Sequence, residues 1–406
     1  MEEQLTPMMQ KYLETKNEYK DCILFYRLGD FYEMFFEDAK CASKELELTL
    51  TGKSCGLKER APMCGVPFHS AEGYITRLVS KGYKVAICEQ VEDPKLAKGL
   101  VKREVVRIVT PGTNCNLEAL DESKNNYLMG VVAMDDLFGI SVVDVTTGEY
   151  RLTEVDTLGK LLDEINKFMP SELICNESFY ISGVDIEDLK ERLGISVSSL
   201  APHYFDEECC KKSLCRHFSV QTLDGLGLVD YSVGITAAGA VMEYLEETQK
   251  TSLAHILELV PYKVGKYMLL DRNTRRNLEL VETLREKKKR GSLLWVLDRT
   301  RTAMGARKLR NTLEQPFIQK EEILKRFDAI DELNANMITR EELREYLNPI
   351  YDLERLLSKI SYKSANPRDF IALKSSLEML PPIRFLCSNF TSRLFAEILE
   401  ELDPLE

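Results

Sequence analysis

The chain has 406 residues, 44% of them hydrophobic, and a formal net charge of -12 at pH 7. This length exceeds a single core of ordinary size and favours about three domains. The sequence contains no run of eighteen apolar residues and no basic start followed by an apolar stretch, which predicts a cytoplasmic protein without membrane-spanning helices. Its 11 Cys lack the even spacing of a disulfide framework, so we expect reduced thiols that fill cores.

The negative charge is distributed unevenly along the chain. Residues 1–115 are neutral, with 17 Lys+Arg and 17 Asp+Glu, whereas residues 263–310 hold 15 Lys+Arg against 5 Asp+Glu, a net +10. The acidic average therefore hides a basic segment. Such a segment is typical of a nucleic-acid contact and equally of the solvated face of long helices, and both interpretations stay open.

The first 115 residues predict a mixed α/β domain. The expected elements, from hydrophobic periodicity and capping residues, are helices at 5–19, 38–46 and from Ser70 to Gly82, and strands at 22–36, 84–88 and 103–109. Residues 110–113, Thr-Pro-Gly-Thr, close this domain. The acidic, Asn-rich residues 116–126 are then expected to form a linker.

The rest of the chain divides into two further units. Residues 127–240 open with a three-stranded meander at 128–133, 140–145 and 150–155, followed by helical and strand segments. Residues 241–406 have few Gly, many i, i+4 charge pairs and the helical period almost throughout, so this unit should be mainly α-helical.

An aromatic cluster near residue 30 raises a question about burial. Six of the twelve residues from Phe25 to Phe36 are Phe or Tyr. On a continuous strand, Phe31 and Glu33 share one face and Tyr32 the other. Burying that face would bury a carboxylate, and solvating it would expose Phe31. An exposed Phe could insert between DNA base steps, and a neighbouring carboxylate could accept a hydrogen bond from a base edge; an ordinary core strand is the alternative.

A nucleotide-hydrolysing function requires a phosphate-binding loop, Gly-x-x-x-x-Gly-Lys-Ser/Thr. Residues 52–54, Gly-Lys-Ser, match only the end of this motif, since the preceding glycine is absent. A turn is the simpler interpretation, and the chain alone should not hydrolyse ATP.

Two metal-dependent functions were considered. Potential zinc ligands cluster within fifteen residues, but their spacing fits no standard finger, and an amphipathic helix with buried thiols explains them as well: His203, Cys209, Cys210, Cys215 and His217. A metal-dependent nuclease could gather Asp135, Asp136 and Asp144 on adjacent strands. Turn chemistry accounts for the first two equally well.

Several sequence blocks then occur in a characteristic order. They are 29–33 (Gly-Asp-Phe-Tyr-Glu), 62–69 (Pro-Met-Cys-Gly-Val-Pro-Phe-His), 82–90, 103–113, 274–280, and 291–298 with 304–307. In these blocks the chain closely resembles the MutS family of DNA mismatch-recognition proteins, from about Leu5 to the C-terminus. The resemblance implies that Phe31 stacks on a mispaired base and that Glu33 hydrogen-bonds it.

The same resemblance implies an architecture and a set of partners. We expect a mismatch-binding domain (1–115), a connector with an RNase H-like fold but without its catalysis (127–240), and a helical core with levers (241–406). The family continues into a clamp and a dimeric ATPase, so the chain is expected to be an N-terminal fragment without catalytic, cofactor or metal-binding residues. ATP, Mg²⁺, the homodimer contact and downstream repair proteins such as MutL are expected of the parent protein. Thr312 stands where the family commonly has Trp.

Overall fold

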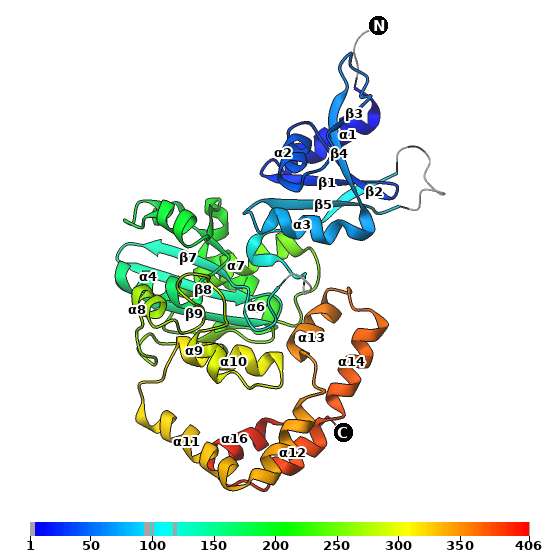
Figure 1. The fold of residues 1–406 in the computed structure, drawn as a ribbon. Helices are drawn as coiled ribbons and strands as arrows, with labels where there is room; N and C mark the ends of the chain where they lie inside the picture. Colours follow the sequence, from blue (N-terminus) through cyan, green and yellow to red (C-terminus); the bar gives the residue numbers. More distant parts are fainter. Residues whose placement is uncertain (1–4, 93–98, 100, 117–119, 406) are drawn as a thin grey trace.

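The computed structural model describes residues 5–92, 99, 101–116 and 120–405. It contains two six-stranded sheets, one after the other along the chain, and a helical region after them (Figure 1). The first sheet lies at the N-terminal end of the molecule, the second sheet in the middle, and helices α11, α12 and α16 at the far end. The predicted combination of two α/β units and one mainly helical unit is confirmed.

The first sheet has the strand order β3-β4-β2-β1-β5-β6, with only the β1–β5 pair parallel among its described pairs. Helices α2 and α3 cover one face, and α1 covers the other. The elements are α1 (Pro7–Glu18), β1 (Cys22–Leu28), β2 (Phe31–Phe35), α2 (Phe36–Leu46), β3 (Thr51–Lys53), β4 (Ala61–Pro67), η1 (Phe68–Ser70), α3 (Ala71–Val79), β5 (Lys84–Gln90), β6 (Arg103–Val109) and η2 (Pro111–Thr113).

The predicted single strand at 22–36 is wrong, because the segment folds into an antiparallel hairpin. Strand β1 pairs with β2 through Tyr26 opposite Glu33 and Leu28 opposite Phe31. Two residues separate the strands, and Gly29 adopts a φ of 60°, which a glycine reaches without steric cost. The predicted turn at residues 52–54 is also wrong in part, since residues 51–53 form the short strand β3.

The second sheet has the order β11-β10-β7-β8-β9-β12. Its antiparallel β7-β8-β9 meander confirms the prediction, and β10 and β11 extend it in parallel, which is the RNase H-like arrangement. The elements are β7 (Leu128–Met134), β8 (Leu137–Asp144), β9 (Glu149–Val155), α4 (Leu158–Phe168), β10 (Glu172–Cys175), α5 (Glu177–Tyr180), η3 (Asp188–Arg192), β11 (Ser196–Ser199), η4 (Pro202–Phe205), α6 (Glu207–Phe218), η5 (Leu223–Leu226), α7 (Ser232–Gln249) and β12 (Val260–Pro261).

The predicted domain boundary at residue 240 falls inside helix α7 and has to be corrected. This helix is continuous from 232 to 249, and its apolar side chains pack on the second sheet together with those of α6. Strand β12 then pairs in parallel with β9. Splitting α7 would expose this core, so the second unit extends to about residue 261.

The Thr-Pro-Gly-Thr segment at 110–113 joins the two sheets through a buried carboxylate. Glu172, on β10, accepts hydrogen bonds from the Gly112 amide (3.0 Å), from the Tyr244 hydroxyl of α7 (2.7 Å) and from the Thr110 hydroxyl. A Cβ at residue 112 would lie 2.9 Å from Leu128 Cβ and 3.0 Å from that of Glu172. Glycine is therefore required here for the close approach of the first unit to the second.

The helical region starts beneath the second sheet and extends away from it (Figure 1). Its helices are α8 (Arg272–Asn277), α9 (Leu293–Leu297), α10 (Ala303–Glu314), α11 (Lys320–Ala335), α12 (Met337–Leu347), α13 (Leu353–Ser361), α14 (Pro367–Leu377), α15 (Leu380–Cys387) and α16 (Arg393–Glu401). Large apolar side chains stay exposed on several of them, among them Phe327, Ile338 and Phe385. No helix among the described residues combines the length and apolar character needed to cross a membrane.

Two arginines of the helical region hold the end of the predicted 116–126 linker. Arg355 of α13, which is 2% exposed, donates to the carbonyls of Asp121 and Lys124. Arg307 of α10 donates to the carbonyl of Glu122 and forms a two-point ion pair with Asp352. Residues 120–125 are thus anchored rather than free; residues 117–119 of the linker lie outside the described residues.

Candidate nucleic-acid interface

Phe31 is the most accessible aromatic residue of strand β2. It is 47% exposed, although it lies between β1 and β4 in the middle of the first sheet. The alternation predicted from the sequence is confirmed, since Tyr32 and Met34 on the other face are 7% and 0% exposed. On the Phe31 face, exposure falls along the strand, to 17% for the Glu33 side chain and 1% for Phe35. The face is therefore open only at its Phe31 end.

The turn before Phe31 is fixed by contacts from two sides. The Phe68 amide donates to the Asp30 carbonyl (3.0 Å), which ties η1 to the turn. The Arg27 guanidinium donates to the Gly29 carbonyl (2.5 Å) and lies 3.7 Å from the centroid of the Phe68 ring. These contacts restrict the backbone on both sides of the turn, so Phe31 is presented from a rigid hairpin.

The opposite side of the hairpin is stabilised by a polar cluster. Tyr32 donates its hydroxyl hydrogen bond to Glu89 of β5, and Arg27 pairs with the same carboxylate at 3.4 Å. Burial and this bond to Glu89 raise the pKa of Tyr32 above its usual value, so the hydroxyl stays protonated. Glu89 thereby links the hairpin to strand β5, the neighbour of β1 in the sheet.

Glu33 has an ion-pair partner that the sequence did not predict. Lys53 Nζ on β3 lies 2.5 Å from Glu33 Oε2 and crosses strand β4 to reach it. The residue opposite Glu33 on β4 is Gly65, where a Cβ would lie 3.5 Å from Glu33 Cγ, so glycine leaves room for the Glu33 side chain. Lys53 belongs to the Gly-Lys-Ser string at 52–54, considered above only as an incomplete phosphate loop. This contact across strand β4 had no local signal in the sequence.

Comparison with known proteins matches three family models in chain order. Residues 6–118 match MutS domain I, residues 126–257 match MutS domain II, and residues 273–405 match MutS domain III. Together these models cover nearly all of the chain. The chain belongs to the MutS family. Phe31, Glu33 and Lys53 all lie within the match to MutS domain I.

Similar curated proteins carry the same family name. The chain is 66% identical over 403 residues to the DNA mismatch repair protein MutS of Lachnoclostridium phytofermentans, covering 99% of this chain and 43% of that protein. It is 52% identical to the MutS proteins of Ruminiclostridium cellulolyticum and Acetivibrio thermocellus, covering 99% of this chain and 46% of each. The chain thus spans less than half the length of these MutS relatives.

The acidic residues considered for a nuclease do not form a site in this MutS chain. Asp135, with a φ of 51°, and Asp136 are exposed at the β7–β8 turn. Asp144 is fully buried at the other end of β8, roughly 23 Å away at about 3.3 Å per residue. It accepts hydrogen bonds from the amides of Asn126 and Thr146. The two ions of such a site lie only about 3.5–4 Å apart and share their carboxylate ligands, so the nuclease alternative is wrong for these residues.

The candidate zinc ligands point to different surroundings around helix α6. Cys209 is exposed, whereas the buried thiol of Cys210 donates to the Tyr204 carbonyl (3.2 Å). His217 Nε2 lies 2.9 Å from the Ile256 carbonyl oxygen. Within the described parts of the chain, no three His, Cys, Asp or Glu side chains are placed to hold a metal ion. Burial raises the pKa of the Cys210 thiol to about 12, as expected for a core-filling cysteine.

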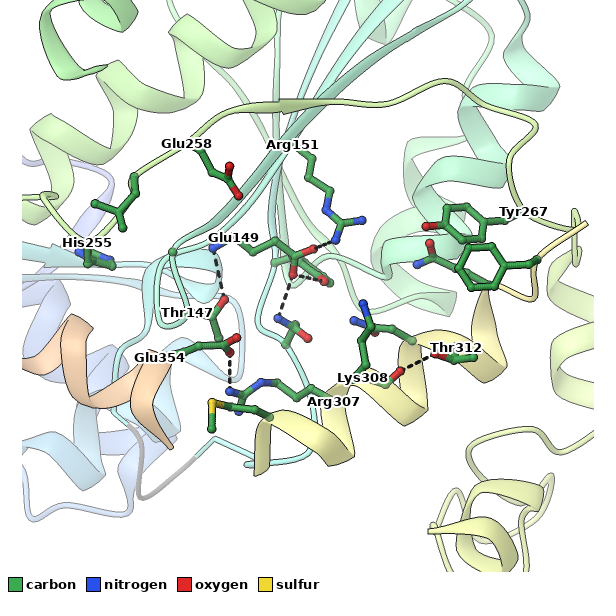
Figure 2. Close-up of a pocket in the computed structure, with 18 of the residues that line it drawn as sticks. Thr147, Glu149, Arg151, His255, Glu258, Tyr267, Arg307, Lys308, Thr312 and Glu354 are labelled. Atoms are coloured by element: carbon green, nitrogen blue, oxygen red, sulfur yellow. Dashed lines mark hydrogen bonds and ion pairs between the residues drawn. The ribbon is translucent and has the colours of Figure 1, made fainter. Parts of the chain in front are cut away.

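A cavity of about 610 Å³ lies between strand β9 and helices α10 and α13. Figure 2 shows its charged walls, in which Arg151 points to Glu149 and Arg307 to Glu354. Glu149 is buried there, which raises its pKa, and it accepts a hydrogen bond from Tyr127 (2.9 Å). Two of the four Lys and Arg side chains in its wall, Arg151 and Arg307, pair with carboxylates of the same wall, and the cavity lies at the junction between the second sheet and the helical region.

The basic segment 263–310 is not a single charged surface. Its residues lie on the short helices α8 and α9, on α10 and on the loops between them, not on the long helices expected. Several of its cations are engaged internally: Arg275 donates to the Leu270 carbonyl, and Lys289 pairs with Asp298 at 2.5 Å. Internal contacts account for these two residues, and a nucleic-acid contact by the rest of the segment stays a prediction.

Proposed function

We propose that this chain recognises mismatched or unpaired bases in duplex DNA and that recognition initiates DNA mismatch repair. Phe31 is the wedge that stacks on the mispaired base, and Glu33 accepts a hydrogen bond from it. The observation that carries the proposal is the half-exposed Phe31 ring on a rigid hairpin, two residues from a carboxylate, within the match to MutS domain I. The relatives' name, DNA mismatch repair protein MutS, supports the same function.

The energetics of base unstacking give this arrangement its selectivity. Inserting an apolar side chain between base steps kinks the duplex and costs a few kcal/mol per step. That cost is smaller where a pair is already defective, so a sequence-independent wedge selects mispairs through the deformability of the DNA. An aromatic ring stacks on any base, and Lys and Arg contacts to phosphates add salt-sensitive affinity that is equal for all sequences.

The Glu33 carboxylate adds to the discrimination between mismatched and fully paired DNA. Glu33 is negatively charged next to a polyanion, so it gains free energy only where a base edge donates a hydrogen bond to it. A fully paired duplex keeps its donors engaged, so Glu33 gains no hydrogen bond from it. The ring therefore supplies affinity for disrupted stacks, and Glu33 penalises intact pairs.

The family resemblance also supports proposals about the longer protein. We assign no enzymatic reaction to these 406 residues, and ATP with Mg²⁺ would act in a part of the relatives that this chain does not match. A homodimer of the longer protein would enclose the duplex, and proteins such as MutL would follow in the pathway. The duplex itself is the partner that Phe31 and Glu33 would contact directly.

The decisive test is fluorescence anisotropy with labelled duplexes that carry either one G·T mismatch or full pairing. We expect Phe31→Ala to reduce the ratio of mismatch to matched affinity by about 5- to 150-fold, because a stacked base is worth about 1–3 kcal/mol. Phe327→Ala is the matched control, since Phe327 is 55% exposed on α11 in the helical region. An unchanged ratio in Phe31→Ala, with an intact circular-dichroism spectrum, would contradict the assigned role.

A further inference from the structure

The environment of Glu33 contains a third candidate residue of the recognition site. Lys53 Nζ contacts only one of the two carboxylate oxygens, Oε2, at 2.5 Å. The lysine side chain is one-third exposed, and its ammonium group lies 5.6 Å from the ring centroid of the buried Phe35. Its stem thus packs along the sheet while its charge reaches Glu33 at the border between the covered and open parts of the face.

The direction of approach leaves the open side of Glu33 available. Lys53 comes from β3, across β4, on the side away from β1. Glu33 is therefore held from one flank only. A base presented beside Phe31, on the same face two residues along β2, would meet a carboxylate whose position is already set.

The charge balance has a further consequence. Duplex DNA carries about one negative charge per 1.7 Å of its axis, so an isolated carboxylate would be repelled before it reached a base. With Lys53 in place, the pair is neutral as a unit and the second oxygen can still accept a hydrogen bond. Lys53 thus reduces the electrostatic repulsion between the Glu33 carboxylate and the DNA phosphates.

We propose that Lys53 is a positioning and specificity-determining residue, which fixes one oxygen of Glu33 and leaves the other for the mispaired base. This inference rests on the proposed function of Phe31 and Glu33. If Lys53 instead only contacts a DNA phosphate, the expected result of its removal is different. Loss of a phosphate contact weakens matched and mismatched binding equally and lowers the salt slope of binding by about one, whatever residue occupies position 33.

The experiment measures the mismatch-to-matched affinity ratio and its salt dependence for four variants of this chain. Lys53→Met removes the charge and keeps the stem, and we expect the ratio to fall about tenfold or more, since bonds between charged groups are strongly directional. Lys53→Arg should restore most of the ratio. In the Glu33→Gln background, Lys53→Met should cause no further change in the ratio, because the two residues act as one unit. Lys44→Met, an exposed lysine on α2 at the other face of the sheet, is the matched control.

The outcomes separate this inference from the proposed function. A wild-type chain with a mismatch preference that Lys53→Met leaves unchanged would overturn the role of Lys53 alone. A ratio that Lys53→Met lowers equally with Glu or Gln at position 33 would also overturn it, because the effect would not pass through Glu33. If Phe31→Ala keeps the wild-type ratio, the proposed function fails, and the assignment of Lys53 fails with it.

Discussion

Replacement of Glu172 by alanine tests how the first two units are held together. Glu172 is fully buried on β10 and accepts hydrogen bonds from Gly112, Thr110 and Tyr244. These donors come from the segment that leaves the first sheet and from helix α7 of the second unit. The variant removes their common acceptor without adding bulk, so we expect residues 110–113 to open locally while both sheets remain folded.

The magnitude follows from the donors that lose their partner. Thr110 still has the Thr113 hydroxyl at 2.9 Å, whereas the Gly112 amide and the Tyr244 hydroxyl are left unpaired in a buried position. Each unpaired buried donor costs about 1–3 kcal/mol, which gives about 2–6 kcal/mol for the two. At 1.4 kcal/mol per factor of ten, amide exchange at Gly112 should accelerate by roughly 30-fold or more.

Hydrogen–deuterium exchange with mass spectrometry measures this change for peptides that contain residues 110–113 and 240–249. Peptides from strand β1 report on the rest of the first sheet and should keep wild-type exchange. Glu342→Ala is the control, because Glu342 is exposed on α12 and its loss should change stability by no more than about 0.5 kcal/mol. An acceleration below about threefold at residues 110–113 would refute the idea that Glu172 fastens this joint.

Two further predictions concern buried titratable groups. Asp144→Asn removes a carboxylate that accepts bonds from Asn125, Asn126 and Thr146, so the free energy of unfolding in urea should fall by about 1–3 kcal/mol; an unchanged midpoint would contradict this. Burial lowers the pKa of His255, so the unfolded state binds more protons and the folded state should lose stability as pH falls below about 6.5, the unfolded value. His255→Gln should lose less stability over this range in urea titrations at successive pH values, and an equal loss would exclude His255 as the cause.

The sequence predicted individual elements well because their patterns are local. Helix α1, strand β6 and the β7-β8-β9 meander occur within a few residues of their predicted positions. The hairpin at Gly29 was missed, because the apolar run continues through the turn and hides its two-residue break. The boundary at 240 was misplaced for a related reason: the change to a helical period marks the start of α7, and only the tertiary packing of that helix assigns it to the second sheet.

In the candidate site as well, local features could be predicted from the sequence and contacts between distant residues could not. Phe31 and Glu33 were predicted to share a face, since strand alternation is a local property, and their exposure bears this out. Lys53 could not be predicted, because its contact with Glu33 depends on the strand order β3-β4-β2, which local patterns do not give. Asp144 illustrates the converse, since a position on adjacent strands suggested a carboxylate cluster with Asp135 and Asp136, and the length of β8 keeps them apart.

The exposure of Phe31 depends on where helix α1 covers the sheet. Phe31 and Phe35 lie on the same face of β2, yet Phe35 is 1% exposed because the Tyr12 ring of α1 packs against it at 4.8 Å. Glu33 lies at the border of this cover, where a carboxylate needs a partner and Lys53 supplies one. The hairpin turn makes Phe31 the first residue of β2, beyond the part of the strand that α1 covers. The strand therefore carries a buried Phe35, a Glu33 that is paired with Lys53 and an exposed Phe31 ring. The same backbone that anchors Phe35 in the core therefore limits the movement of Phe31, so in the proposed function the ring would meet DNA without first losing conformational freedom.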